Sequence, residues 1–231
     1  MDAIPQPQFL NRNNHHASNV IIMSKRIPAT HPVALGLAIA CGLALPLASS
    51  AQEAPWLVRL RAVELNSANK DSTGLDLSIN NKLIPEIDFS YFFTPQIAAE
   101  LVLTYPQKQT IRSAGSDIGS LKHLPPTLTA QYHFTSLGAI KPYVGAGINY
   151  TRFSNVDFDP AVQAALQPSL SKNSFGLALQ AGVDFELMKG TYLNLDVKKV
   201  QIRTDVSSAG TKVGTFKVDP WLIGIGVGRR F

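Results

Sequence analysis

From Trp56 to the C-terminus, apolar residues recur at every second position in eight segments separated by turn-like stretches. This is the period of a β-strand, in which successive side chains point to opposite faces. The eight segments are 56–65, 84–93, 96–105, 126–134, 141–153, 174–186, 193–202 and 221–231. Eight short strands with little other regular structure predict an all-β fold, either a barrel or a sandwich.

The connections between these segments alternate between short and long. The short ones are 94–95, 135–140 and 187–190, and the long ones are roughly 66–82, 106–125, 154–173 and 204–219. Outer-membrane barrels have brief periplasmic turns and longer extracellular loops, and an even strand number places both chain ends on the periplasmic side. We therefore predict an eight-stranded antiparallel transmembrane β-barrel in a cell outer membrane, with 221–231 closing the ring against 56–65.

The charged residues agree with a membrane position. They share a face of each strand opposite the apolar face, and a charge that meets lipid at the bilayer midplane costs about 2–4 kcal/mol. The inner face also carries many glycines, which leave room for bulky inward side chains in a narrow barrel. The predicted lumen-facing residues are Arg59, Arg61, Glu86, Asp88, Glu100, Gln131, His133, Asp184, Lys198 and Arg230.

Aromatic residues gather near the strand ends, where membrane proteins carry interfacial girdles. We assign to these girdles Trp56, Tyr91, Phe93, Tyr105, Tyr132, Phe134, Tyr150, Phe153, Trp221 and Phe231.

Two local features modify the simple pattern. In segment 193–202 the apolar residues change parity after Val197, and a β-bulge near Lys198 and Lys199 would restore the face. In the connection 154–173, the stretch 160–166 predicts a short helix with Asp159 as its N-cap. This helix would serve as a lid, or simply cover the barrel mouth.

The N-terminal part has the composition of a secretory signal. Lys25 and Arg26 precede the unbroken apolar run 33–47, and small residues at Ser49 and Ala51 suit signal peptidase. The run is shorter than the roughly 20 residues of a membrane helix. We predict an upstream extension at 1–22, a signal peptide at 23–51 and the barrel at 52–231. An uncleaved anchor and lipidation at Cys41 are the alternatives.

Composition narrows the possible chemistry. The single cysteine, Cys41, lies inside the apolar run, so a chain that begins at Gln52 would have neither disulfides nor thiol catalysis. From Gln52 on, 18 basic and 15 acidic residues give a net charge of +3, and the basic residues are scattered rather than clustered with aromatics. This pattern argues against nucleic-acid binding.

Metal binding and catalysis receive little support. His123 and His133 lack the neighbouring cysteine or carboxylate spacing of a metal site, and we expect no cofactor. The sequence has no clear Ser/His or paired-carboxylate spacing for catalysis, so we expect no enzyme activity. Asp88 and His133 would meet inside a barrel, but so would almost any inward pair.

Three runs carry a resemblance to a known family. They are HLPPTL at 123–128, KPYVGAGINY at 141–150, and DPW at 219–221 followed by a terminal Arg-Phe. Together they resemble the OmpW family of small outer-membrane proteins over essentially all of the chain from Gln52. The resemblance implies a narrow, largely apolar channel that is proposed in the family to pass small hydrophobic molecules through the outer membrane.

The resemblance also implies a route and partners. The solute would enter at the extracellular end and leave sideways into the bilayer, which avoids the polar lipopolysaccharide layer. Prolines remove ladder hydrogen bonds, so Pro125, Pro126 and Pro142 are candidate weak points for that exit. Phe231 resembles the terminal signal that the outer-membrane assembly machinery reads. The implied partners are therefore outer-membrane lipid, lipopolysaccharide, the assembly machinery and a small hydrophobic solute.

This chain departs from the family pattern inside the barrel. The inward face of segment 84–93 carries Glu86 and Asp88, and Lys198 stands where the family has an apolar or aromatic lumen residue. Acid–base pairs across the middle of the lumen would admit apolar solutes from above and resist ions and water below, or they would form an ordinary polar core. Beside the conduit, two further functions stay open: a structural or surface-interaction barrel without transport, and a lipid-acting enzyme.

Overall fold

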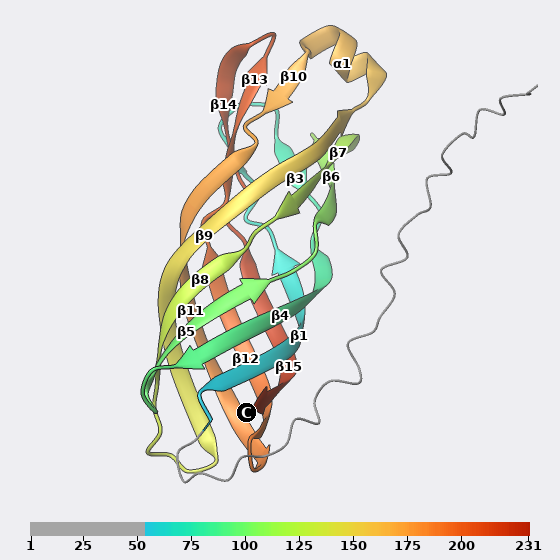
Figure 1. Ribbon diagram of the computed structural model, residues 1–231. Coiled ribbons are helices and arrows are strands. Elements are labelled where there is room, and N and C mark those ends of the chain that lie inside the picture. Colours follow the sequence, from blue (N-terminus) through green and yellow to red (C-terminus); the bar gives the residue numbers. More distant parts are fainter. Residues whose placement is uncertain (1–53) are drawn as a thin grey trace, which may run out of the picture. The chain divides into compact units, whose positions relative to one another are not determined.

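The computed structural model describes residues 54–231 (Figure 1). The predicted upstream extension, the signal peptide and its cleavage point lie outside these residues. Eight strands form a closed antiparallel ring, in the order β1–β4–β5–β8–β9–β11–β12–β15 and back to β1. Their bounds are Trp56–Asn66 (β1), Lys82–Phe92 (β4), Ile97–Leu103 (β5), Thr127–His133 (β8), Ile140–Phe158 (β9), Asn173–Met188 (β11), Thr191–Val200 (β12) and Trp221–Arg230 (β15). The predicted eight-stranded barrel is confirmed.

The ring closes between the first and last strands, as predicted. β1 and β15 pair from Leu57 opposite Arg230 to Asn66 opposite Trp221. At the end of the barrel that holds both of these chain ends, short turns at 93–96, 134–139 and 189–190 join the strands. We call this the terminal end, and the opposite end the loop end.

The long connections contain further strands, which the sequence pattern did not predict. They are β2 (Lys70–Asp71), β3 (Leu77–Ile79), β6 (Gln107–Ser113), β7 (Ser116–Leu124), β10 (Pro168–Leu170), β13 (Arg203–Ser208) and β14 (Thr211–Lys217). The β6–β7 hairpin pairs with the upper part of β9, and the β13–β14 hairpin pairs with β10 and β2. The barrel wall therefore continues beyond the ring at the loop end (Figure 1). The pattern missed these strands because many of their buried positions, such as Gln107, Gln109 and Thr204, are polar.

The expected helix is present as α1 (Pro160–Leu166), with Asp159 at its N-cap position as predicted. The Asp159 side chain makes no capping hydrogen bond, and only its backbone carbonyl accepts one, from the Gln163 N–H at 2.8 Å. Pro160 at the start of the helix needs no N–H partner and has the φ that a helix requires. Within residues 54–231, no helix is long and apolar enough to cross a membrane.

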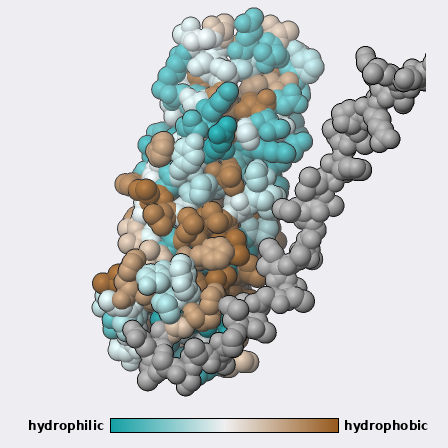
Figure 2. Space-filling model, viewed as in Figure 1, coloured by the Kyte–Doolittle hydropathy of each residue, from teal (hydrophilic) through white to brown (hydrophobic). Residues whose placement is uncertain are grey.

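The outer surface of the ring is apolar. Figure 2 shows brown side chains gathered over the ring strands and teal ones over the loop end. Leu83, Phe175, Leu177, Leu179 and Ile148 are all more than half exposed on this surface. Most of the aromatic residues assigned to girdles are also exposed, but Phe153 is only 2% exposed and packs inside the barrel. Its assignment was wrong because Phe153 has the inward parity of β9, opposite to that of Tyr150.

The expected bulge in β12 is also wrong. β12 pairs with β11 without a shift from Tyr192 to Val200, and its buried residues alternate without interruption. The inward residues simply change from polar, at Asn194, Asp196 and Lys198, to apolar at Val200. A change in the chemistry of the lumen therefore looks, in the sequence, like a change of strand parity.

Glycines on the inner face give room to large side chains, and Gly182 is the clearest case. A Cβ at Gly182 would meet the Tyr143 hydroxyl and ring, and would lie 2.7 Å from the Leu195 carbonyl oxygen. At Gly224 the nearest atom is a methyl carbon of Val63 at 3.2 Å. The first contact involves a buried ring and backbone, whereas the second is tight but involves side-chain atoms that can shift.

We predict that Gly182→Ala destabilises the barrel by about 1–3 kcal/mol, because it overpacks the interior. Gly224→Ala is the matched control on the same inner face and should cost clearly less. Urea unfolding of the refolded protein in lipid vesicles measures both free energies. Equal losses for the two variants would contradict the role assigned to Gly182.

Candidate functional site

The interior of the barrel is divided by chemistry into two parts. Toward the terminal end lies a set of hydrogen-bonded polar side chains, which we call the polar plug: Arg59, Arg61, Glu86, Asp88, Glu100, Tyr143, Gln180, Asp184, Asn194, Asp196 and Lys198. Toward the loop end lies the apolar chamber, whose buried residues are Val63, Leu65, Leu77, Ile79, Ile84, Ile111, Leu121, Phe153, Ala178, Val200, Ile202, Val206, Phe216, Val218 and Leu222. The division can be seen along one strand. In β1 the inward residues Arg59 and Arg61 belong to the polar plug, and the next inward residues, Val63 and Leu65, belong to the apolar chamber.

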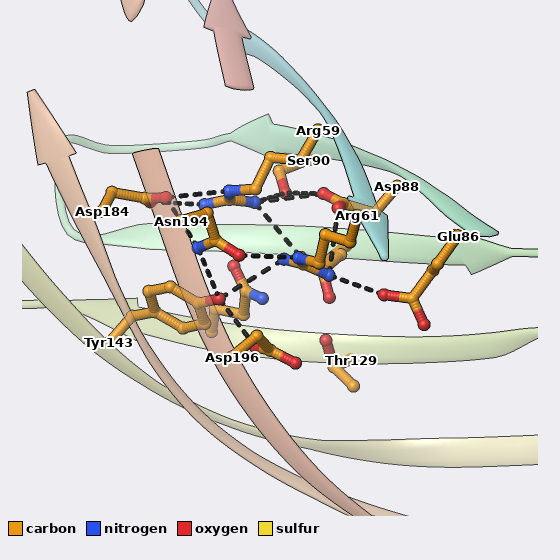
Figure 3. A network of polar contacts seen from close by, with 12 residues as sticks. Arg59, Arg61, Glu86, Asp88, Ser90, Thr129, Tyr143, Asp184, Asn194 and Asp196 are labelled. Carbon is orange, nitrogen blue, oxygen red and sulfur yellow. Dashed lines mark hydrogen bonds and ion pairs between the residues drawn. The ribbon is translucent and has the colours of Figure 1, made fainter. Parts of the chain in front are cut away.

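Arg59 lies at the centre of the polar plug (Figure 3). Its Nε and Nη2 donate to the two Asp184 carboxylate oxygens, at 3.0 and 2.6 Å. Its Nη1 lies 3.1 Å from Asp88 Oδ1 and 3.2 Å from Glu100 Oε2, and donates to the Ser90 hydroxyl at 3.0 Å. The Arg59 side chain is fully buried. One guanidinium therefore connects β1, β4, β5 and β11 across the lumen.

Arg61 forms a second layer beside it. Its Nη1 lies 2.9 Å from Glu86 Oε1 and 3.0 Å from Asp88 Oδ2, and its Nη2 lies 3.3 Å from Glu100 Oε2. Its Nε donates to the Asn194 side-chain oxygen at 2.7 Å. Asp88 and Glu100 are thus shared between the two arginines, which makes the plug a continuous network rather than a set of separate pairs.

Lys198 forms the boundary between the polar plug and the apolar chamber. Its ammonium group lies 2.7 Å from Glu86 Oε1 and 2.9 Å from Asp196 Oδ1. Asp196 Oδ2 in turn accepts hydrogen bonds from the Tyr143 hydroxyl and the Gln180 amide, both at 2.7 Å. Every charge at this boundary therefore has a charged partner.

The remaining predicted residues lie nearer the terminal end or beside the plug. The Gln131 amide donates to the Gln180 side-chain oxygen at 3.1 Å, and its own oxygen lies 2.9 Å from His133 Nε2. The His133 ring stacks on Tyr143, with centroids 4.9 Å apart. The half-buried Arg230 places its guanidinium 4.0 Å from the centre of the Phe92 ring.

Of the ten residues predicted to face the lumen, nine are buried inside the barrel and Arg230 is half-buried. The predicted set did not include Tyr143, Gln180, Asn194 and Asp196, which complete the network. Tyr143 shares the inward parity of Gly145 and Gly147, and that parity was the signal available in the sequence.

The apolar chamber contains two hollows. The upper hollow, of about 490 Å³ including space open to solvent, lies beneath α1 and is lined only by apolar residues, among them Leu77, Ile111, Val162, Leu166 and Phe216. The lower hollow, of about 380 Å³ by the same measure, rests on the plug. Its lining is Leu65, Ile84, Glu86, Val102, Thr104, Pro125, Thr127, Asn149, Lys198, Val200, Ile202, Pro220 and Leu222.

The wall next to the lower hollow lacks ladder pairing. β5 pairs with β8 only as far as Val102 opposite Thr127, and β6 pairs with β7 from Gln107 opposite His123. Between these ladders, residues 104–106 belong to no strand and form no ladder pair in the described part of the chain. Facing them are residues 124–126, so this part of the wall contains three prolines, at 106, 125 and 126. We call it the wall gap.

The candidate exit prolines therefore lie in different settings. The Asn149 amide donates to the carbonyl oxygens of Pro125 and Pro126, at 3.2 and 3.1 Å. These bonds hold the two prolines against β9, whereas no ladder joins them to the chain that follows β5. Pro142 lies inside β9 toward the terminal end, opposite Val183, and its carbonyl accepts the Phe134 N–H at 2.8 Å. Pro106 was not singled out from the sequence.

Neither a metal site nor a catalytic pair is visible among residues 54–231. No group of three or more His, Cys, Asp or Glu residues is arranged there to hold a metal ion. Of the histidines in this part of the chain, His133 has Gln131 as its side-chain partner and both His123 ring nitrogens are without one. Neither lies in a Ser–His or Asp–His hydrogen bond.

Comparisons with known proteins agree with this architecture. Residues 58–231 match the model of the OmpW family. An outer-membrane protein of Sinorhizobium fredii, y4mB, is 41% identical, with 88% of this chain and 85% of the relative covered. Outer membrane protein W of Vibrio cholerae is 32% identical, with 83% and 98% covered.

A third relative and a solved structure extend the comparison. A Pseudomonas aeruginosa protein named for a dibenzothiophene metabolism operon, PahQ, is 29% identical, with 78% of this chain and 90% of the relative covered. The crystal structure of the outer membrane protein OprG from Pseudomonas aeruginosa superposes with a TM-score of 0.67 at 25% identity, and covers 78% of this chain and 97% of that one.

We predict that Arg59→Met destabilises the barrel by about 3–5 kcal/mol, because Asp88, Glu100 and Asp184 stay buried and lose a shared cation. Arg112→Met is the matched control, since the Arg112–Asp117 pair is exposed at the loop end and should be worth about 0–1 kcal/mol. Urea unfolding in lipid vesicles measures both. An Arg59→Met barrel as stable as the control variant would show that the plug is not a cooperative network.

Proposed function

Because the chain belongs to the OmpW family and its barrel lies in the outer membrane, we propose that it conducts small hydrophobic molecules from the cell surface into the bilayer. The observation that carries the proposal is the apolar chamber, which begins with an apolar hollow at the extracellular loop end and stops on the polar plug. A chamber of this kind suits apolar solutes. An aqueous pore would need a polar lining along its whole length.

Entry at the loop end is favoured by the lining of the upper hollow. Removing apolar surface from water stabilises a bound solute by about 25 cal/mol per Å². Val162 and Leu166 of α1 lie at this hollow together with Leu75, so the first surface that a solute meets is apolar. The loop end thus offers a route past the polar outer layer of the membrane.

The polar plug makes passage along the barrel axis unfavourable. An apolar solute would have to separate Lys198 from Glu86 and Arg61 from Asp88, and would leave buried charges without partners. Breaking such buried pairs costs several kcal/mol. The same network resists water and ions, because its donors and acceptors already have partners.

We propose lateral release through the wall gap because the polar plug closes the lower end of the apolar chamber. Thr104 and Pro125 line the lower hollow, so a solute held there contacts a segment of wall that has no ladder hydrogen bonds. Opening the wall at this point separates no ladder pairs. We place the exit at Pro125 and Pro126 with Pro106, rather than at Pro142 within β9.

The surroundings of the barrel supply the other partners. The exposed apolar surface of the ring contacts outer-membrane lipid, and the loop end projects toward lipopolysaccharide. The terminal Phe231, at the end of β15, would be read by the outer-membrane assembly machinery. The name of the PahQ relative, which refers to dibenzothiophene metabolism, is compatible with an aromatic solute.

A structural or surface-interaction barrel without transport is the second candidate function. The observation that favours it is the plug itself, which closes the lumen toward the periplasm. We propose no enzyme activity, in keeping with the match of residues 58–231 to the OmpW family of outer-membrane barrels.

The direct test of the proposed function is uptake. Cells with and without the gene are given a panel of hydrophobic compounds that includes dibenzothiophene, and accumulation is followed over time. We expect faster accumulation of at least one compound when the protein is present, and no change for a hydrophilic sugar. Equal rates across the whole panel would remove the conduit and leave the structural barrel.

The lateral route is tested by a disulfide across the wall gap. Pro106→Cys with Leu124→Cys, in a Cys41→Ser background, would join the two sides of the wall gap. We expect uptake to fall severalfold on oxidation and to recover with a reductant, because the gap can no longer widen.

The matched control is Lys108→Cys with Lys122→Cys, which links partners already paired in the β6–β7 ladder. This bond should leave uptake unchanged. Undiminished uptake through the oxidised 106–124 barrel, with cross-linking verified by mass spectrometry, would exclude this exit.

A further inference from the structure

Three polar side chains interrupt the apolar chamber between its two hollows. They are Gln107 and Gln109 of β6 and His123 of β7, which we call the polar trio. All three are buried, with exposed fractions of 0%, 0% and 1%. The chamber residues around them, such as Phe153 and Leu121, are apolar, so the trio is a small polar site inside an apolar space.

The trio carries hydrogen-bonding atoms that have no partner within residues 54–231. These are Gln107 Oε1, both amide atoms of Gln109 and both ring nitrogens of His123. The Gln107 amide nitrogen donates to the Tyr105 carbonyl at 2.9 Å, so that side chain is held in place with its oxygen left unpaired. Buried polar atoms in native proteins are nearly always paired, since an unpaired one costs free energy.

Strand register places the trio on the path between the hollows. Gln107 lies directly opposite His123, and Gln109 follows on the same inward face. The next inward residue of β6 is Ile111, which lines the upper hollow, while Thr104 below Gln107 lines the lower one. The trio lines neither hollow but lies between residues that line them, so a solute that moved from the mouth of the barrel to the wall gap would pass beside it.

The site is uncharged at neutral pH. The buried His123 ring has no carboxylate partner among residues 54–231 that would stabilise a charged imidazolium. A neutral imidazole has one donor and one acceptor nitrogen, and each glutamine amide has both kinds of atom. The trio thus offers donors and acceptors together without a net charge, which suits an uncharged polar group and not an ion.

We propose that the polar trio binds the single hydroxyl or carbonyl group of an otherwise apolar solute. The solute class is then aliphatic or aromatic alcohols and ketones, in preference to hydrocarbons without a polar group. This inference rests on the proposed conduit function and adds a selectivity to it. The apolar body would occupy a hollow while its polar group pairs with Gln109 and His123.

The experiment compares two probes of the same shape, 1-naphthol and naphthalene. Equilibrium dialysis measures their binding to the full barrel in lipid nanodiscs, after subtraction of binding to nanodiscs without protein. We expect the unsubstituted barrel to bind 1-naphthol about tenfold more tightly than naphthalene, as a buried hydrogen bond of ordinary strength would give.

The decisive variant is Gln109→Leu, which removes both unpaired amide atoms at nearly constant volume. It should weaken 1-naphthol binding by about fivefold to tenfold and leave naphthalene binding unchanged or tighter. Gln163→Leu, on the exposed surface of α1, is the control and should change neither. If Gln109→Leu does not fold, Gln109→Met removes the same amide with a flexible side chain.

The outcomes separate the two proposals. Equal binding of both probes to the unsubstituted barrel, or an unchanged preference in Gln109→Leu, would overturn the polar trio as a binding site and leave the conduit standing. Failure of the unsubstituted barrel to bind either probe would overturn the conduit and this inference together.

Discussion

The structure depends on the pairing of Arg59 and Arg61 with carboxylates inside a ring whose outer face meets lipid. A guanidinium cannot face hydrocarbon, so the alternation of each strand sends charges inward. Inside, an isolated charge would be equally unfavourable, and only a network that satisfies each group makes the arrangement possible. Arg59 alone contacts Asp88, Glu100 and Asp184 from three different strands. The order of strands and their register are therefore coupled through the plug as well as through the backbone ladders.

The narrow interior decides which other residues are tolerated. An eight-stranded ring has space for side chains and for little else, so the long arginines and Tyr143 require small neighbours. Gly182 lies against Tyr143, and Gly226 and Gly228 lie against the side chains of Arg61 and Arg59. The glycine-rich pattern of β15 is thus the spatial complement of the charged pattern of β1, its partner in the ring.

Strand parity was sufficient to predict the ring and to assign inward charges, because lipid outside makes the alternation strict. Strand parity was misleading where the residues that line the lumen change from polar to apolar. Val200 and Ile202 suggested a bulge only because the inner face of β12 becomes apolar above Lys198, and Phe153 was assigned to the surface because aromatic residues are common at membrane interfaces. Beyond the ring, contact with lipid does not require apolar and polar residues to alternate, so the sequence of β6 and β7 has the pattern of a loop. Gln107, Gln109 and His123 could therefore not be recognised as inward residues.

The position of the plug explains why the weak segment of wall lies where it does. If the lumen were open to the periplasm, solutes would pass along the axis and unpaired backbone at 104–106 would only reduce stability. With a floor formed by Glu86 and Lys198, the lowest point that an apolar molecule reaches is the lower hollow, and Thr104 and Pro125 are part of its lining. The prolines on both sides of the gap have no N–H, so they cannot donate ladder hydrogen bonds across it. Closure of the axis and weakening of the wall are thus two parts of one arrangement, and in the proposed conduit they would direct the solute into the bilayer and not into the periplasm.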